Sequence, residues 1–158
     1  MGFKIYIGVV CTTAAILAGC AERTAASAKL PNDVATVGIQ VKGLQRKMRV
    51  NEEVVLPISI HNNGVAAIPS EGKPDGSFVI RATYHWLRPD GPVAVWDGVR
   101  TKLPQDIAKG KSADISLSLK APSEPGKYIL VIDLVQEGAL WFADTGSQTA
   151  TLAYVIEN

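Results

Sequence analysis

Apolar and polar residues alternate along four stretches of the chain, and this period of two constrains its fold more than any other feature. In residues 54–62, positions 54, 56, 58 and 60 are aliphatic, while the intervening side chains are mostly polar. The same alternation runs through residues 78–86, 113–119 and 127–136. Successive side chains of a strand point to opposite faces, so the pattern predicts antiparallel strands with one buried and one solvated face.

Turn-forming residues separate these stretches and four shorter apolar ones. The shorter strands are expected at residues 36–42, 92–97, 139–142 and 148–156, and the turns at residues 62–64, 89–91, 109–111 and 124–126. No segment beyond the N-terminal region shows a helical period longer than a turn or two. About seven or eight short strands at this spacing predict an all-β fold, an immunoglobulin-like two-sheet β-sandwich. Trp86 alternates in phase with apolar residues and is expected in its core.

Several segments resemble known bacterial domains. Residues 121–130 resemble the strand, turn and strand of bacterial immunoglobulin-like modules. Residues 84–87, 96–104 and 133–142 are similar to accessory β-sandwich domains of proteins that synthesise surface polysaccharides, and the likeness extends over residues 50–145. The sequence shows no transferase or transport domain beside them, so the resemblance implies a fold and leaves the function open.

The N-terminal region has the pattern of a secretory signal. Lys4 precedes an apolar run that ends in small residues before Cys20, and this arrangement resembles the lipobox of bacterial lipoproteins. The resemblance implies cleavage before Cys20 and attachment of lipid, palmitate included, to that cysteine. In such lipoproteins an Asp directly after the cysteine retains the product at the inner membrane, and Ala21 stands at that position here. The resemblance therefore implies that the protein is anchored to the outer membrane, at its periplasmic face. An uncleaved N-terminal anchor helix is the alternative.

These patterns divide the chain into three parts. Residues 1–19 are the predicted signal peptide, residues 20–35 the lipidated cysteine with a flexible tether, and residues 36–158 the β-sandwich domain. Removal of the signal takes Lys4 from the 16 basic residues and leaves the 15 acidic ones, so the mature chain is balanced in charge. Such a balance gives no field for nucleic acid, and we expect no nucleic-acid partner.

The residue stock argues against catalysis. Only two histidines are present, His61 and His85, and neither has the spacing of a metal site. No nucleophile elbow occurs, so we expect no enzyme activity, no cofactor and no metal. A carboxylate pair among Asp97, Asp133 and Glu137 that acts on a glycosidic bond remains the open catalytic alternative. In the non-catalytic interpretation Asp97 begins a hairpin turn, and Asp133 is an exposed strand residue facing Arg81 or His85.

Two tryptophans at predicted strand ends, Trp96 and Trp141, are the better candidates for binding, because indole rings stack on sugars and anchor protein interfaces. Packing against the end of the sandwich is the alternative for both. The other candidate binding residues are Arg81, His85, Asp97, Arg100 and Glu137. Of these, Arg81 and His85 are expected to line an exposed face of the sheet.

Two functions follow from this set of candidates. The first is a non-catalytic adaptor that binds another envelope protein through an edge strand or the Trp96/Trp141 end. The second is a carbohydrate-binding module for cell-surface or periplasmic polysaccharide.

Overall fold

The computed structural model describes residues 28–74 and 76–158, and the predicted signal peptide and Cys20 lie outside them. The elements are β1 (Val37–Val41), β2 (Lys47–Arg49), β3 (Glu53–Asn62), β4 (Ile80–Leu87), β5 (Val93–Val95), β6 (Thr101–Lys102), β7 (Ser112–Lys120), β8 (Gly126–Gln136), β9 (Leu140–Trp141), the 3₁₀ turn η1 (Phe142–Thr145) and β10 (Ala150–Glu157). The four alternating stretches correspond to β3, β4, β7 and β8.

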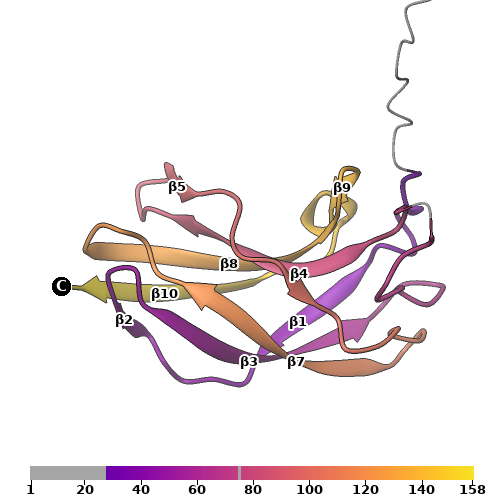
Figure 1. Cartoon of the computed structure of the whole chain (residues 1–158), viewed down its shortest axis with the longest axis horizontal. Coiled ribbons are helices and arrows are strands. Elements are labelled where there is room, and N and C mark those ends of the chain that lie inside the picture. The colour runs from indigo at the N-terminus through magenta and orange to yellow at the C-terminus, as the bar shows by residue number, and fades with distance from the viewer. Residues whose placement is uncertain (1–27, 75) are drawn as a thin grey trace, which may run out of the picture.

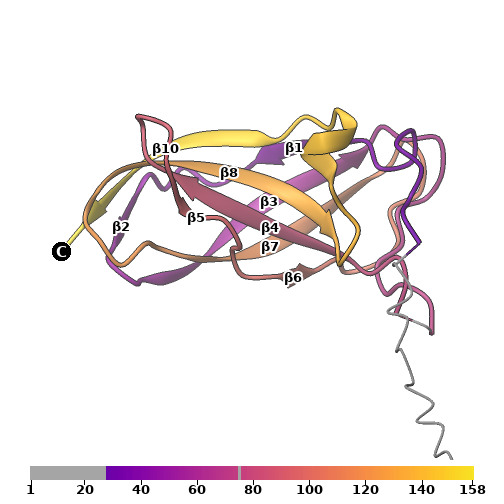
Figure 2. The ribbon, with the colours of Figure 1, turned by 90° about the horizontal axis from the view of Figure 1, so that it is seen from above.

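The strands form two sheets that pack face to face (Figure 1). The smaller sheet has the order β1-β3-β7, and the larger has the order β2-β10-β8-β4-β5, with β6 also paired to β4 and β9 to β8. Figure 2 views the molecule turned by 90°, with the first described residues and the C-terminus at opposite ends of the sandwich. The prediction of an all-β, two-sheet β-sandwich is confirmed.

Three details place the sandwich in the immunoglobulin-like class. The N-terminal strand is divided between the sheets, since β1 pairs antiparallel with β3 while β2 pairs parallel with β10. Trp86 on β4 has no exposed surface. The hydroxyl of Tyr128, near the start of β8, donates to the carbonyl of Glu124 at 3.0 Å, which is the tyrosine corner of such domains.

The core lies between the sheets and is centred on Trp86. Its ring makes edge contacts with Tyr84, Tyr128 and Tyr154, with centroids 5.3 to 6.2 Å apart. The indole Nε1 donates to the carbonyl of Lys120 on β7 at 2.9 Å, and the amide of Lys120 donates to the hydroxyl of Tyr84 at 2.9 Å. Trp86 and Tyr84 therefore join the larger sheet to the last residue of β7.

β5 and β6 form one interrupted edge strand, because both pair antiparallel with β4, at opposite ends of it. Residues 96–100 cross between them, and the amide of Gly98 donates to the carbonyl of Tyr84 at 3.0 Å. The prediction of a hairpin turn at Asp97 is wrong, because the chain continues along β4 instead of reversing. A Cβ at Gly98 would lie 2.5 Å from the Tyr84 carbonyl oxygen, so this close approach requires glycine.

The described part of the predicted tether is packed against the domain. Leu30 and Ala35 are buried. The side chain of Gln136 accepts from the Leu30 amide at 2.8 Å and donates to the Ala28 carbonyl at 2.6 Å. The packed domain therefore begins before residue 36, and residues 20–27 of the predicted tether lie outside the described residues. Within residues 28–74 and 76–158, no helix has the length and apolar character needed to cross a membrane.

Candidate functional site

The outer face of the larger sheet, which points away from the smaller sheet, carries most of the candidate residues. Thr83 and His85 of β4 project there, and Asp133 of β8 stands opposite Thr83. Residues 96–100 cover this face from one side, and β9 with η1 covers it from the other. In Figure 1, β5 and β9 stand above β4 and β8 on this face.

This covering overturns two expectations. His85 was predicted on an exposed sheet face and Asp133 as an exposed strand residue, yet both are buried, with Asp133 only 1 % exposed. They do point away from the core, as the alternation predicts. They are hidden because segments distant in sequence pack over them, and a period of two carries no information about such segments.

Three aromatic residues, His85, Trp96 and Trp141, form what we name the aromatic corner. The imidazole of His85 stacks on Trp96 with centroids 4.2 Å apart and planes 23° apart. Trp141 stands edge-on to both rings, with its centroid 4.6 Å from that of His85 and 5.6 Å from that of Trp96. The Nδ1–H of His85 donates to the Trp96 carbonyl. Trp96 is thereby fixed along one face while 51 % of the residue stays exposed.

Arg100 ties the corner to the sheet. Its guanidinium donates to Glu137 at 3.0 Å, to Asp97 at 2.9 Å and to the Thr83 hydroxyl at 3.1 Å. Its Cζ also lies 5.3 Å from the centroid of the Trp141 ring, within the range of a cation–π contact. One side chain thus holds the covering segment, the β8–β9 turn and an indole of the corner in fixed relation.

Asp133 attaches η1 to β8. Its carboxylate accepts from the amide of Leu134 at 2.7 Å and from that of Ala143 at 3.2 Å. Loss of solvent raises the pKa of Asp133 above its ordinary value, although these amides and the nearby His85 act in the opposite direction. The buried carboxyl positions the turn that follows Trp141.

A hollow of about 190 Å³ opens beside the aromatic corner. The corner forms one wall, and Leu87 and Val131 contribute an aliphatic surface. Asp133 and the exposed Asp144 are the carboxylic acids in its lining. The hollow is mostly apolar and is bordered by negative charge.

The structure brings six of the seven candidate binding residues together and separates one. The six that are linked by ring contacts or hydrogen bonds are His85, Trp96, Asp97, Arg100, Glu137 and Trp141. Arg81 does not join them, since its guanidinium donates to the carbonyls of Ser70 and Ile80 at 3.0 and 2.8 Å. Sequence reasoning missed Thr83, whose place on the polar side of β4 was the available signal, and Asp144, for which the sequence gives none.

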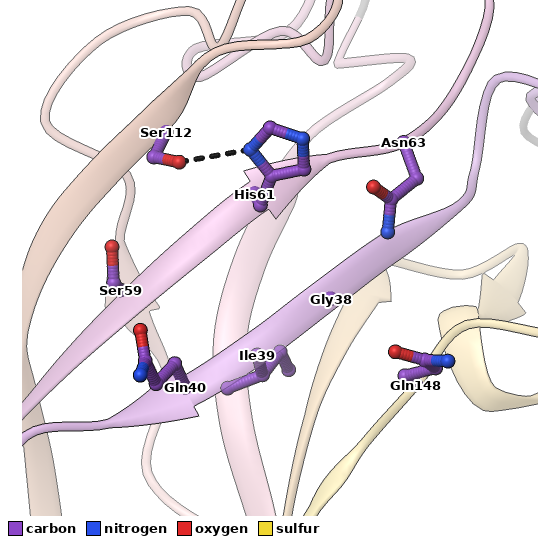
Figure 3. Close-up of a pocket in the computed structure, with 8 residues that line it drawn as sticks. All are labelled: Gly38, Ile39, Gln40, Ser59, His61, Asn63, Ser112 and Gln148. Carbon is purple, nitrogen blue, oxygen red and sulfur yellow. Dashed lines mark hydrogen bonds between the residues drawn. The ribbon is translucent and has the colours of Figure 1, made fainter.

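A second hollow lies on the outer face of the smaller sheet (Figure 3). Its volume is about 440 Å³, and it is lined by Gly38, Ile39, Gln40, Ser59, His61, Asn63, Ser112 and Gln148. Six of these carry amide, hydroxyl or imidazole groups, and Nδ1 of His61 lies 2.9 Å from the Ser112 hydroxyl. This polar hollow contains hydrogen-bonding groups and no aspartate, glutamate, lysine or arginine.

His85, Asp133 and Asp144 line the hollow beside the aromatic corner, but they are not grouped as metal ligands. Over the part of the chain that the structure describes, no three side chains from His, Cys, Asp and Glu are grouped as metal ligands.

Comparison with known proteins gives only a remote likeness. No family model matches the chain, and no curated protein matches it. Similar solved structures include the CARDB domain of a Pyrococcus furiosus protein in complex with di-metal ions, at 12 % identity and a TM-score of 0.43 over 77 % of this chain and 85 % of that one. β-Glucosidase from Listeria innocua in complex with glucose is 9 % identical, with a TM-score of 0.47 over 77 % of this chain and 16 % of that one. The sporulation control protein Spo0M from Bacillus subtilis is 11 % identical, with a TM-score of 0.45 over 78 % of this chain and 50 % of that one. Identities this low carry no function to the present chain.

Proposed function

We propose that this protein is a non-catalytic adaptor of the cell envelope that binds a partner protein at its aromatic corner. Lipid on Cys20 would hold it at the periplasmic face of the outer membrane, as its lipobox-like sequence implies. The observation that carries the proposal is Trp96, a rigidly held indole with half of its surface exposed. Tryptophan and arginine are enriched among the residues that dominate protein interfaces.

The fixed geometry of the corner favours tight binding. Trp96 is stacked on His85, and Arg100 is held by Glu137 and Asp97, so little side-chain entropy is lost when a partner docks. β5 lies beside the corner at the end of its sheet, where a partner strand would find an available edge, and Val93 on it is exposed.

The engaged state of the acids supports a non-catalytic role. Asp97 and Glu137 both accept hydrogen bonds from Arg100. Asp133 is buried and accepts from two backbone amides. A glycosidase-type carboxylate pair requires one acid to give a proton and another to face the sugar, and these three carboxyls are committed to structural contacts instead.

Crosslinking of the full-length protein in the cells that produce it tests this proposal. The proteins recovered with the wild type would be identified by mass spectrometry, with Cys20→Ser as the unanchored control. We expect a specific protein that is recovered with the wild type and lost with Trp96→Ala. Leu44→Ala is the matched surface control, because Leu44 is 91 % exposed and lies between β1 and β2. Equal recovery with Trp96→Ala and the wild type would contradict the proposal.

Carbohydrate binding is the second candidate, and the polar hollow of Figure 3 favours it. Neutral sugars are recognised through hydrogen bonds from amides and hydroxyls, which this hollow presents from Gln40, Asn63 and Ser112. Envelope polysaccharide retained by the wild type, and lost with Gln40→Ala but kept with Trp96→Ala, would support this function over the adaptor.

A further inference from the structure

Negative charge is concentrated around the aromatic corner. Asp97, Asp133, Glu137 and Asp144 lie on or beside it, together with the cation Arg100. The domain as a whole is close to balanced in charge, so this face is locally acidic. Arg100 forms ion pairs with Asp97 and Glu137. The two acids that line the hollow, Asp133 and Asp144, are not among its ion-pair partners.

Asp144 lies close enough to Asp133 to affect the ionisation of Asp133. Asp144 is among the groups that raise the pKa of Asp133, alongside the larger effect of burial. Like charges at one site disfavour the ionised form, and a cation between them removes that cost. A cation in the hollow would therefore offset the repulsion between the carboxylates of Asp133 and Asp144.

Its walls suit a cation with an aliphatic stem. The ring faces of tryptophan attract ammonium and guanidinium groups. The corner already makes one such contact, since the guanidinium of Arg100 lies 5.3 Å from the centroid of Trp141. Leu87 and Val131 add apolar surface against which methylene groups can pack.

We infer that this hollow receives a single lysine or arginine side chain from the partner protein. Its volume of about 190 Å³ is below the roughly 300 Å³ at which clefts begin to hold drug-sized ligands, and it suits one side chain. The basic head lies against Trp96 and Trp141 and near the Asp144 carboxylate, with its stem on the aliphatic wall. This inference rests on the adaptor function and specifies what the adaptor recognises.

Ligand titration of the full-length protein in detergent micelles tests it. The probes are N-acetyl-lysine methylamide, N-acetyl-arginine methylamide and the neutral N-acetyl-norleucine methylamide, followed through the indole N–H resonances of Trp96 and Trp141. We expect the basic probes to shift both resonances and to bind at least tenfold more tightly than the norleucine probe. Equal binding of all three, or no shift at all, would overturn the inference.

Two charge substitutions distinguish a specific effect of Asp144 in the hollow from a general effect of surface charge on binding. Asp144→Asn is expected to weaken the basic probes at least threefold and to leave the norleucine probe unchanged. The control is Asp90→Asn, an exposed acid of the β4–β5 turn, which is expected to change neither. Equal weakening by both variants would show a nonspecific charge effect and overturn the inference.

Two further outcomes identify what has failed. Tetramethylammonium bound more tightly than either amino-acid probe would overturn the assignment to a protein side chain and indicate a free quaternary amine. If Trp96→Ala abolishes partner capture while the basic and neutral probes bind alike, the adaptor function stands and the inference about its ligand falls. If Trp96→Ala leaves partner capture intact, the adaptor function itself fails.

Discussion

The two faces of the larger sheet are built from the same strands and differ in what buries them. On the inner face, Ile80, Tyr84 and Trp86 pack against the smaller sheet. On the outer face, His85 and Asp133 are covered only by short crossing segments tied down by hydrogen bonds. The inner face supplies most of the apolar burial and therefore most of the stability. The outer face holds polar and aromatic groups in a fixed arrangement, as recognition requires.

Removal of an inner-face ring is expected to have the largest effect. Trp86→Ala loses a fully buried indole and the hydrogen bond from its Nε1 to the Lys120 carbonyl, so the free energy of unfolding should fall by about 3–5 kcal/mol. Trp96→Ala, the outer-face counterpart, should cost about 1 kcal/mol or less, since half of that residue is exposed. Denaturant titration measures both. Similar losses for the two variants would remove the distinction between the faces.

The second largest loss of stability is expected from a methyl group placed between residues 96–100 and β4. In Gly98→Ala the new Cβ would meet the carbonyl oxygen of Tyr84 at 2.5 Å and its ring at 2.7 Å. Residues 96–100 must then move away from β4, at a cost of about 1–3 kcal/mol in unfolding free energy. The control is Val99→Ala at the exposed neighbour, expected within about 0.5 kcal/mol of the wild type. An unchanged Gly98→Ala would mean that the segment is not held against β4.

Loss of the Arg100 guanidinium is expected to lower stability less than these two changes do. It is also expected to loosen the packing of the aromatic corner. Arg100→Gln removes bonds to Glu137 and Asp97 from a partly buried side chain and should cost about 1–2 kcal/mol. Near-ultraviolet circular dichroism should report loosened indoles. Arg88→Gln breaks the exposed pair with Glu124 and the cation–π contact of Arg88 with Tyr128, and it should lower the free energy of unfolding less than Arg100→Gln does, because solvent screens an exposed pair. If the two variants match in both measurements, Arg100 has no organising role.

The pH dependence of stability distinguishes the buried acid from the exposed ones. Burial raises the pKa of Asp133 above 3.8, so the folded state holds its proton more strongly than the unfolded state does. Its contribution to stability is therefore greatest at low pH and declines as pH rises from about 3.8 through the folded value. Asparagine does not titrate, so Asp133→Asn lacks this decline. The unfolding free energy of the wild type minus that of the variant should therefore fall as pH rises.

Exposed acids act with the opposite sign. Hydrogen bonds from Ser70 lower the pKa of Asp106, and Lys42 and Ser59 do the same for Asp114. Their stabilisation is present at neutral pH and is lost as pH falls through the folded values. Because both acids are kept in Asp133→Asn, their effect cancels in the comparison with the wild type. A difference that stays constant or rises with pH would contradict the assignment to Asp133.

The inner face was predictable from sequence and the outer face only in part. A period of two identifies the core side of β4, and Trp86 was correctly expected there. The grouping of Trp96 with Trp141 agrees with their selection as strand-end aromatics, although ring contact itself depends on three-dimensional packing. The burial of His85 and Asp133 depends on segments whose path no local pattern records.

Short elements escaped prediction for a related reason. β2 and β6 have three and two residues, too few to display a period. Their positions are set by pairing with β10 and β4. Leu30 belongs to a segment of polar and small residues that is typical of a tether. It is nevertheless buried, and Gln136, a residue far away in the sequence, holds the backbone of this segment by hydrogen bonds.

Site-directed photo-crosslinking can show whether the outer face of the larger sheet is the binding surface. A photo-reactive amino acid would replace Val93 on the edge strand β5 that leads to Trp96, Gln40 in the polar hollow or Leu44 on the β1–β2 connection, in the lipidated protein within its cells. We expect a discrete protein adduct from position 93 and none from positions 40 and 44. An adduct from position 40 with none from position 93 would contradict it and move the site to the smaller sheet.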